Sequence, residues 1–491
     1  MKSRAGAQPL SLPRLGLRHL VLYPLLLRLF LSGVLPFLLD SGTLIPGLRY
    51  TDVDYAVYTD AAALLKGGGS PYDRPTYRYT PFLAHAIRIA NAPWNAFWDV
   101  LLPGRGIFVD GGGRVLFVAS DALCGYLVAV LRARVSGDGA GQWDLLWWAY
   151  NPVAIVICTR GSCESFLVLL PVLTAVWLAL AASDGGADVG GRGRRRMHRS
   201  AALIGVALGI AAHNRLYPAI YIPAFMAYLS RREGAASGAP CWAAGRSLLR
   251  SFPWTRPRTL ASYALLWVRR AFGVPSSAIC LSAFLVTFCG TWAAAHALHG
   301  HDALHHGLLH HLGRMDNRHN YSPFWYWIYL AGARYSPHPS SMSAALSAFS
   351  SLPQLAVILL TSVGLAPDDL PVALLVQTLF FVAANRVATA QYLTWWMALL
   401  PLCAGRPGDE TGMGTSREHR RLIAPGLGTV VALAGWSTAA YGLEMSGLDN
   451  YLLTWGASVA YWAANVWFIV AFLGGTQKEG LLHFPEKTHC D

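Results

Sequence analysis

The length and composition of this chain exclude a soluble enzyme. Of its 491 residues, 54% are hydrophobic and only 13% are charged, against roughly 25% charged residues in an ordinary globular protein. So few charges cannot cover the surface of a soluble fold, and so many apolar side chains exclude a disordered chain. The net charge of +13 comes from arginines that cluster between apolar segments. That pattern is typical of the cytosolic loops of a membrane protein rather than of a nucleic-acid-binding surface.

Apolar segments recur along the whole chain and predict an all-α polytopic membrane protein that forms a single multi-span domain over residues 1–491. A bilayer core about 30 Å thick needs roughly 20 apolar residues in a helix, which predicts about 10–13 transmembrane helices here. Several segments are short or contain a proline (Pro152, Pro218), so broken helices are expected among them. The segments are 18–39, 113–133, 143–159, 164–182, 201–213, 215–230, 277–296, 342–365, 370–384, 390–404, 423–442 and 454–474.

Basic residues predict the topology. The first span is preceded by Lys2, Arg4, Arg14 and Arg18. By the positive-inside rule these residues place the N-terminus in the cytosol, and alternating spans then put all basic loops and both termini on that face. The predicted cytosolic loops are 183–200, 231–275 and 405–421. The opposite face collects residues 40–112, 160–164, 213–214, 297–323, 385–386 and 444–449.

Two carboxylates, Asp52 and Asp54, stand two residues apart in the first non-cytosolic loop, about residues 40–112. The loop is rich in tyrosine and threonine and leads to Arg78 and Tyr79. A carboxylate beside a sugar hydroxyl can act as a general base, and a guanidinium offers a fork of donors to phosphate. A pair of aspartates alone also occurs in ordinary solvated loops, but the surrounding residues favour a sugar-phosphate site.

Other polar clusters on the same face have both a structural and a functional interpretation. Arg160 and Glu164 either pair at the boundary of a helical hairpin or contribute to a binding site. His213 and Arg215 lie at a membrane edge, where an arginine reaching toward water would by itself explain the charge. The sequon Asn320-Tyr321-Ser322 is followed by a proline and lies close to a span, which disfavours glycosylation there.

The segment 296–319 holds eight of the sixteen histidines. The pairs His301/His305 and His306/His310 have the spacing that zinc uses on a helix. Apart from Asp302, no carboxylate or cysteine completes a ligand set at comparable spacing. We therefore expect an interfacial helix rather than a metal site.

The segment 50–84, YTDVDYAVYTDAAALLKGGGSPYDRPTYRYTPFLA, resembles the signature of the first mannosyltransferases of glycosylphosphatidylinositol (GPI) anchor synthesis. Its DxD, SPY and YRYTP patterns carry the resemblance. Further similar segments follow in the family's order at 151–165, 213–221, 311–330 and 385–402, with a weaker match at 442–444. The three cytosolic loops and most of the histidine-rich segment are unlike the family, and loops tolerate such insertions.

The resemblance implies a GT-C-type glycosyltransferase of the endoplasmic-reticulum membrane with a lumenal active-site loop. Such an enzyme transfers mannose from dolichyl phosphate mannose to the 4-hydroxyl of glucosamine in glucosaminyl-phosphatidylinositol, and some relatives have a small stabilising membrane subunit. Asp52 and Asp54 would be catalytic. Polar residues of the matching segments are the candidate substrate-binding residues: Arg78, Tyr79, Arg160, Glu164, His213, Tyr217, His319, Asn320, Tyr321, Asn385, Arg386, Gln391 and Glu444.

The chemistry of this reaction limits what the protein must supply. The leaving group is a phosphate monoester whose second pKa lies near 6, so no strong general acid is needed. The family's donor is β-linked and its product α-linked, so a single in-line displacement with one carboxylate as base is sufficient. A cation at the departing phosphate would stabilise its charge. Candidates for that cation are Arg78, Arg160, His213, His319 and Arg386. A single phosphate brings less charge than a diphosphate, so neither a metal nor another cofactor is expected.

Two other functions remain as alternatives at this point. Another dolichol-linked sugar transferase, acting on an asparagine-glycan precursor or on protein, would share the DxD loop but not the other matching segments. A multi-span transporter would show inverted repeats and polar residues inside its spans. Here no repeat is visible, and the polar residues collect at span ends on one face.

The topology prediction can be checked with glycosylation tags. A tag inserted near Gly68 should be modified in the endoplasmic reticulum, whereas a tag near Gly190 should stay unmodified. The two products differ in gel mobility before and after glycosidase treatment. The reverse pattern would place the DxD loop in the cytosol.

Overall fold

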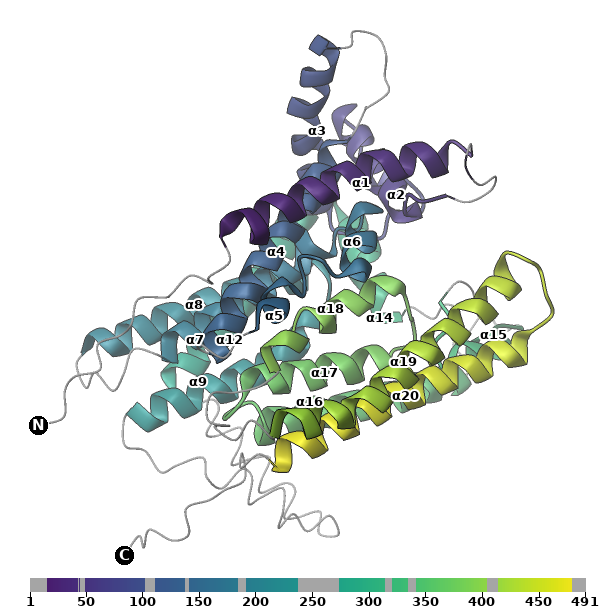
Figure 1. Ribbon diagram of the computed structural model, residues 1–491. Helices are drawn as coiled ribbons and strands as arrows, with labels where there is room; N and C mark the ends of the chain where they lie inside the picture. The colour runs from purple at the N-terminus through teal and green to yellow at the C-terminus, as the bar shows by residue number, and fades with distance from the viewer. Residues whose placement is uncertain are drawn as a thin grey trace, which may run out of the picture. The chain divides into compact units, whose positions relative to one another are not determined.

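The computed structural model is all-helical over the residues that it describes, and these divide into two compact units (Figure 1). The first unit comprises residues 1–314, 358–374 and 393–404, and the second comprises residues 315–357, 375–392 and 405–491. The structure describes every residue except 1–15, 43, 45–48, 102–110, 137–140, 184–190, 237–272, 314–319, 334–340, 404–413 and 479–491.

The first unit contains most of the helices. In chain order they are η1 (Arg18–Leu22), α1 (Tyr23–Asp40), α2 (Val53–Lys66), η2 (Pro71–Asp73), α3 (Pro81–Leu101), α4 (Gly112–Ser136), α5 (Gln142–Leu146), α6 (Pro152–Thr159), η4 (Ser165–Leu169), α7 (Leu170–Ser183), α8 (Gly191–Asn214), η5 (Tyr217–Tyr221), α9 (Ile222–Ala236), α12 (Pro275–His299), α13 (His301–Leu304), η6 (His305–Leu309), α14 (His310–Gly313), α18 (Leu393–Met397) and η8 (Leu400–Cys403).

The second unit contains α15 (Trp325–Ala333), η7 (Ala390–Tyr392), α19 (Gly414–Glu444) and α20 (Tyr451–Lys478), while the boundary between the units falls within α16 (Ser341–Gly364) and α17 (Leu370–Ala383). The short connection 445–450 makes α19 and α20 an antiparallel pair, in which Trp436 stacks on Tyr461 with ring centroids 5.9 Å apart. The indole of Trp436 also donates to the carbonyl of Tyr321, 2.8 Å away. This hydrogen bond fixes the segment just before α15 to the α19–α20 pair.

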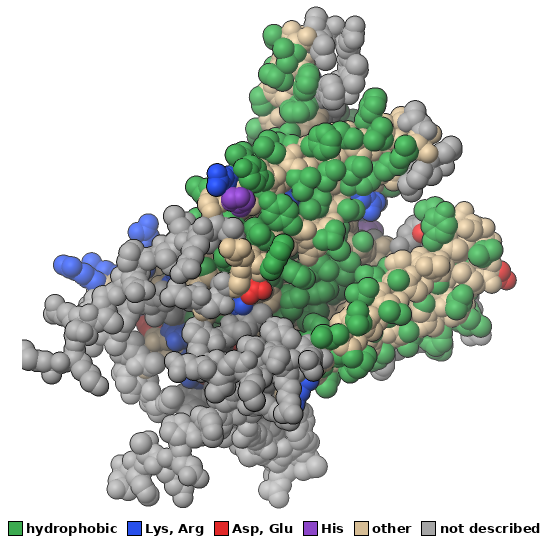
Figure 2. Space-filling model, in the orientation of Figure 1, with side chains coloured by type: hydrophobic (Ala, Val, Ile, Leu, Met, Phe, Trp, Pro, Cys, Tyr) green, Lys and Arg blue, Asp and Glu red, His purple; other side chains and the backbone are tan. Residues whose placement is uncertain are grey.

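Six helical segments within the described residues are long and apolar enough to cross a membrane. They are Arg18–Asp40, Gly112–Ser136, Ser165–Ala182, Pro275–His299, Arg421–Glu444 and Tyr451–Gly474, and two shorter apolar segments are Ser351–Gly364 and Leu370–Ala383. Figure 2 shows many hydrophobic side chains along the visible faces of α1, α19 and α20. Exposed large apolar residues of these helices include Phe30, Phe37, Val431 and Val470. Apolar exposure on this scale suits lipid rather than water.

Two of the predicted spans are broken into short helices. Segment 143–159 contains α5 and α6, separated by residues 147–151, and α6 begins with Pro152 at its first position. The Asn151 side chain caps α6 by accepting from the backbone N–H groups of Val153 and Ala154. Segment 390–404 contains η7, α18 and η8. The predicted non-cytosolic loop, in contrast, holds two regular helices, α2 and α3.

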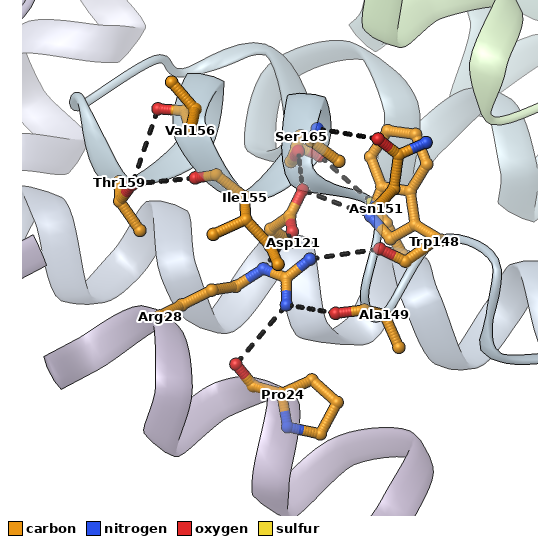
Figure 3. Close-up of polar contacts among 12 residues, drawn as sticks. Pro24, Arg28, Asp121, Trp148, Ala149, Asn151, Ile155, Val156, Thr159 and Ser165 are labelled. Atoms are coloured by element: carbon orange, nitrogen blue, oxygen red, sulfur yellow. Dashed lines mark hydrogen bonds and ion pairs between the residues drawn. The ribbon is translucent and has the colours of Figure 1, made fainter. Parts of the chain in front are cut away.

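A buried ion pair joins α1 to α4 (Figure 3). The Arg28 Nε lies 2.6 Å from Asp121 Oδ2, and the two side chains are 0% and 1% exposed. The remaining Arg28 donors reach backbone carbonyls, including those of Trp148 at 3.1 Å and Ala149 at 2.7 Å. Asp121 Oδ1 accepts from the Ser165 hydroxyl at 2.6 Å. A charge buried in an apolar interior is tolerated only when its hydrogen-bonding capacity is filled in this way.

Glycines allow α8 and α12 to pack closely. A Cβ atom on Gly205 would collide with the carbonyl oxygen of Cys280, and one on Gly209 would lie 2.7 Å from the Cβ of Thr287. The two glycines are four residues apart and face the same neighbour, which is the small-xxx-small arrangement common between membrane helices.

Substitution of Gly205 by leucine should therefore destabilise the first unit by about 1–3 kcal/mol, because the added side chain forces α8 away from α12. The melting temperature of the detergent-solubilised protein measures the effect. Gly290→Leu on α12 is the matched control, since a Cβ there meets nothing within 4 Å. Equal melting temperatures for the two variants would contradict this packing.

Candidate functional site

The first carboxylate of the DxD pair begins helix α2. Asp52 has extended backbone angles (φ −64°, ψ 137°), and its Oδ1 accepts from the Asp54 N–H at 3.1 Å. Aspartate is a favoured N-cap, and the helix dipole stabilises its negative charge there. The side chain remains 18% exposed. The local sequence therefore places an ionised carboxylate at a helix N-terminus, where it remains accessible.

The segment 50–52 lies against the end of α6. The Asp52 N–H donates to the carbonyl of Arg160 at 3.0 Å, and the Arg160 Nε donates to the carbonyl of Tyr50 at 3.0 Å. The Arg160 Nη2 also lies 3.9 Å from Asp52 Oδ2, as a partly exposed ion pair. Two hydrogen bonds to backbone carbonyls thus bring together a carboxylate and a guanidinium that are 108 positions apart in the chain.

Gly161 makes the close approach of these segments possible. Its φ is +98°, and a Cβ atom would lie 2.6 Å from the ring of Tyr55. Any other residue would be strained in this conformation and would also displace the tyrosine. The glycine of the TRG pattern is therefore explained by backbone geometry.

The second carboxylate, Asp54, lies near Tyr79. Burial, and after it the charge of the Asp54 carboxylate, raise the pKa of Tyr79 well above its ordinary value. The Tyr79 ring packs edge-on against Tyr58 at 4.7 Å, and the Arg215 guanidinium lies 5.0 Å from its centroid. Tyr79 therefore stays protonated and can donate a hydrogen bond, which suits the positioning of an anionic or hydroxyl group.

Glu164 and Arg215 form a second, more deeply buried ion pair. Both Nε and Nη2 of Arg215 donate to Glu164 Oε1, at 3.1 and 2.7 Å. The other oxygen, Oε2, accepts from the indole of Trp395 at 2.8 Å, and Tyr217 stacks on that indole at 3.7 Å. The Glu164 residue is only 1% exposed. These contacts join the loop after α6 to η5 and α18.

The remaining candidates of the first unit have varied surroundings. Arg78 is half-buried, and its backbone carbonyl accepts from His311 Nε2 at 2.7 Å. His213 is 6% exposed and packs against Trp292 with ring centroids 4.5 Å apart. The structure thus gathers Asp52, Asp54, Tyr79, Arg160, Glu164 and Tyr217 into connected contacts, with Arg78 adjoining Tyr79 in the chain.

Most of the other candidates belong to the second unit. Tyr321 is 5% exposed, and its carbonyl accepts from Trp436. The side chains of Asn320, Asn385, Arg386, Gln391 and Glu444 are of intermediate exposure. His319 lies outside the described residues. A role for these residues in substrate binding stays a prediction.

Sequence reasoning missed two arginines and one hydrogen bond. Arg114 contacts the residues next to Asp52 and Arg160, and Arg215 was explained only by its place at a membrane edge. The hydroxyl of Thr80 donates to the side chain of Asn214 at 2.9 Å. A weak signal existed for Arg114, because a cation in the first turn of a helix opposes the helix dipole.

Among the described residues, no three His, Cys, Asp or Glu side chains converge in a way that could hold a metal ion. His85 Nε2 and His299 Nε2 lie 3.0 Å apart, between α3 and α12, as a hydrogen-bonded pair. Independence of metal remains a prediction about the reaction.

Comparison with known proteins gives a consistent family. The family model described as "Mannosyltransferase (PIG-M)" matches residues 157–473. "GPI alpha-1,4-mannosyltransferase I, catalytic subunit" of Danio rerio is 33% identical over 428 residues, covering 86% of this chain and 88% of the relative. "GPI mannosyltransferase 1" of Aspergillus oryzae is 30% identical over 440 residues, covering 88% and 92%. The Neurospora crassa protein of the same name is 31% identical, covering 87% and 88%.

Asp52 and Asp60 offer a matched pair of carboxylates at α2. Asp52→Asn should lower mannosyl transfer at least about 100-fold, because an amide has nearly the same shape but cannot accept a proton as a general base. Asp60 is 53% exposed and pairs with Arg74, so Asp60→Asn should keep its activity. Transfer is measured in membranes that contain equal amounts of each variant. Normal transfer by Asp52→Asn would remove Asp52 as the base.

Proposed function

The chain belongs to the mannosyltransferase (PIG-M) family, and on that premise we propose that it transfers the first mannose of GPI-anchor synthesis through an α-1,4 linkage. The relatives named for this activity match 86–88% of the chain. The structural observation that carries the proposal is the carboxylate of Asp52, which is partly exposed at a helix N-terminus beside the guanidinium of Arg160. It has the position and the charge that a general base needs.

The donor is dolichyl phosphate mannose, and the acceptor is the 4-hydroxyl of glucosamine in glucosaminyl-phosphatidylinositol. Asp52 takes the proton from the acceptor hydroxyl as the oxygen attacks the anomeric carbon, and the bond to the dolichyl phosphate breaks with inversion. The phosphate leaves as a stable anion, so no strong acid is required. The backbone N–H of Asp54 donates to the Asp52 carboxylate. The Asp54 side chain lies near Tyr79, and together they position the acceptor hydroxyls.

An in-line displacement separates two electrostatic tasks. The base and the departing phosphate lie on opposite faces of the sugar. One cation therefore lies beside the base, and a different cation stabilises the charge of the departing phosphate. Arg160 lies beside Asp52 and helps to orient that carboxylate. Arg78 is the candidate of the first unit that adjoins Tyr79 and is half-buried, and we assign the donor phosphate to it.

We place the reaction on the lumenal face of the endoplasmic-reticulum membrane, because the basic loops mark the opposite face as cytosolic. Both substrates carry lipid chains, which suits a protein whose helices expose apolar side chains to the bilayer. The Danio rerio relative is named a catalytic subunit, which supports a small stabilising membrane subunit as partner. A transporter has no support from the family match, and another dolichol-linked transferase would not explain the names of the relatives quoted above.

Restoration of GPI-anchored proteins tests the proposal. The chain is expressed in cells that lack their first GPI mannosyltransferase, and surface GPI proteins are counted by flow cytometry. We expect restoration by the wild-type chain and none by Asp52→Asn at equal abundance. If the partner subunit of the host does not fit, co-expression with the cognate subunit provides the same test. No restoration in either setting, with the protein present in the membrane, would contradict the proposed activity.

The transfer should not need a metal ion. The donor has a single phosphate, whose departure develops less charge than that of a diphosphate, so a divalent ion has less charge to neutralise. Membranes treated with excess EDTA and supplied with preformed dolichyl phosphate mannose should therefore keep their activity. Activity that disappears with EDTA and returns with Mn²⁺ or Mg²⁺ would make the aspartate pair a metal site instead of a base.

A further inference from the structure

Arg114 occupies an unfavourable place for a cation. It lies in the first turn of α4, which begins at Gly112, and the helix dipole disfavours positive charge at a helix N-terminus. None of the ion pairs between described residues includes it. Local helix energetics therefore do not explain this arginine, and its contacts with other segments do.

The guanidinium of Arg114 bridges the two segments that form the site. Its Nη2 donates to the hydroxyl of Thr51 at 2.6 Å, and its Nη1 donates to the carbonyl of Thr159 at 3.2 Å. Thr51 directly precedes Asp52 in the chain, and Thr159 directly precedes Arg160. One planar group thus spans the gap between the two residues that flank the Asp52–Arg160 pair.

Both partners of Arg114 are themselves held in place. Asp40, at the end of α1, accepts from the backbone N–H of Thr51 at 3.1 Å and from the Thr51 hydroxyl. The Thr159 hydroxyl donates to the carbonyl of Ile155 at 2.7 Å and lies 2.7 Å from the hydroxyl of Tyr50. Because neither segment can rotate freely, the bridge fixes their register rather than the position of one loose side chain.

Tyr55 closes the arrangement. The Arg114 guanidinium lies 4.5 Å from the centroid of its ring, and the Arg114 backbone N–H donates to its hydroxyl at 3.1 Å. The ring of Tyr55 also contacts Gly161, the residue after Arg160. Stacking on the ring restricts the orientation of the guanidinium. The group then loses less conformational entropy when it donates to two acceptors at once.

We propose that Arg114 is a positioning residue of the transferase: it sets the register of segment 50–54 against segment 159–161 and so holds the Asp52 carboxylate in line with the acceptor hydroxyl. This inference rests on the proposed function for its consequence in catalysis. Arg114 itself contacts no reacting atom in this arrangement. Lysine can replace it only in part, because a single ammonium group lacks the planar fork that donates to Thr51 and Thr159 at once.

Kinetics of Arg114→Ala and Arg114→Lys test the proposal, with Arg134→Met as the matched control. Arg134 lies near the other end of α4 and donates to the carbonyl of Leu180. Per folded molecule, we expect the kcat of Arg114→Ala to fall about 10- to 100-fold, since a displacement near 1 Å has such an effect. The KM for the acceptor should stay within about twofold, because alignment of the base acts on the chemical step. The kcat of Arg114→Lys should lie between those of the wild type and Arg114→Ala, and the kcat of Arg134→Met should match that of the wild type.

Two further measurements separate positioning from general damage to the fold. Methylguanidinium added to Arg114→Ala should restore part of the kcat, whereas methylammonium should not. Amide hydrogen exchange should accelerate in peptides covering 50–54 and 159–161 of Arg114→Ala, and not in those of Arg134→Met. An unchanged kcat per folded molecule, or unchanged exchange in both peptides, would overturn the proposal. If the wild-type chain transfers no mannose, the proposed function fails, and the exchange measurement still decides whether Arg114 holds the two segments.

Discussion

The site of this protein depends on the burial of one ion pair, Arg28 with Asp121. Moving two charges out of water costs several kcal/mol each, and the pair is tolerated only because every strong donor and acceptor is matched. Arg28 therefore holds α1 against α4 and against the carbonyls at 148 and 149, while Asp121 holds the Ser165 hydroxyl. Residues 148 and 149 lie in the break between α5 and α6, and Ser165 lies in the chain after Arg160. The Arg28–Asp121 pair therefore holds both regions. Loss of one partner would leave the other charge buried without compensation.

From that anchor the site is assembled at the ends of helices. Helix α1 ends at Asp40, whose carboxylate accepts from the N–H groups of Tyr50 and Thr51, and α6 ends next to Arg160. Two short segments that are far apart in the chain are then joined by one backbone hydrogen bond and by side-chain hydrogen bonds to backbone carbonyls, without forming a sheet. Helix ends suit this purpose, because they leave backbone groups unpaired within the helix and bring a dipole that favours a carboxylate.

The charges of the first unit are graded by exposure, and the grading matches their tasks. Asp52 and Arg160 are partly exposed and lie 3.9 Å apart, so the carboxylate is held near a cation and stays partly accessible. Glu164 is almost fully buried and in direct contact with Arg215 at 2.7 Å, and the indole of Trp395 donates to the remaining carboxylate oxygen. This second pair is suited to holding the loop after α6 in place, since none of its oxygen atoms is left for a reactant. A transferase needs both, because a reacting carboxylate must be available while its surroundings stay rigid.

The sequence by itself determined the class of the protein and its family, and it predicted the chemistry of the DxD loop. Composition and the recurrence of apolar segments carry this information, because lipid solvation is a property of local sequence. The cap at Asp52 was not predicted, because residues 40–112 were expected to form a loop and the structure shows helix α2 there. The prolines predicted that some spans are broken, but only the tertiary structure placed the break of segment 143–159 between α5 and α6 and divided segment 390–404 into η7, α18 and η8. It alone decided that Arg160 lies beside Asp52 and that Glu164 contacts Arg215 and Trp395. It also revealed Arg114 and the Arg28–Asp121 pair, which stand inside or at the edge of predicted spans. Contacts of this kind join residues that are tens to hundreds of positions apart. The hydrophobic periodicity of a sequence does not indicate which buried charges form pairs.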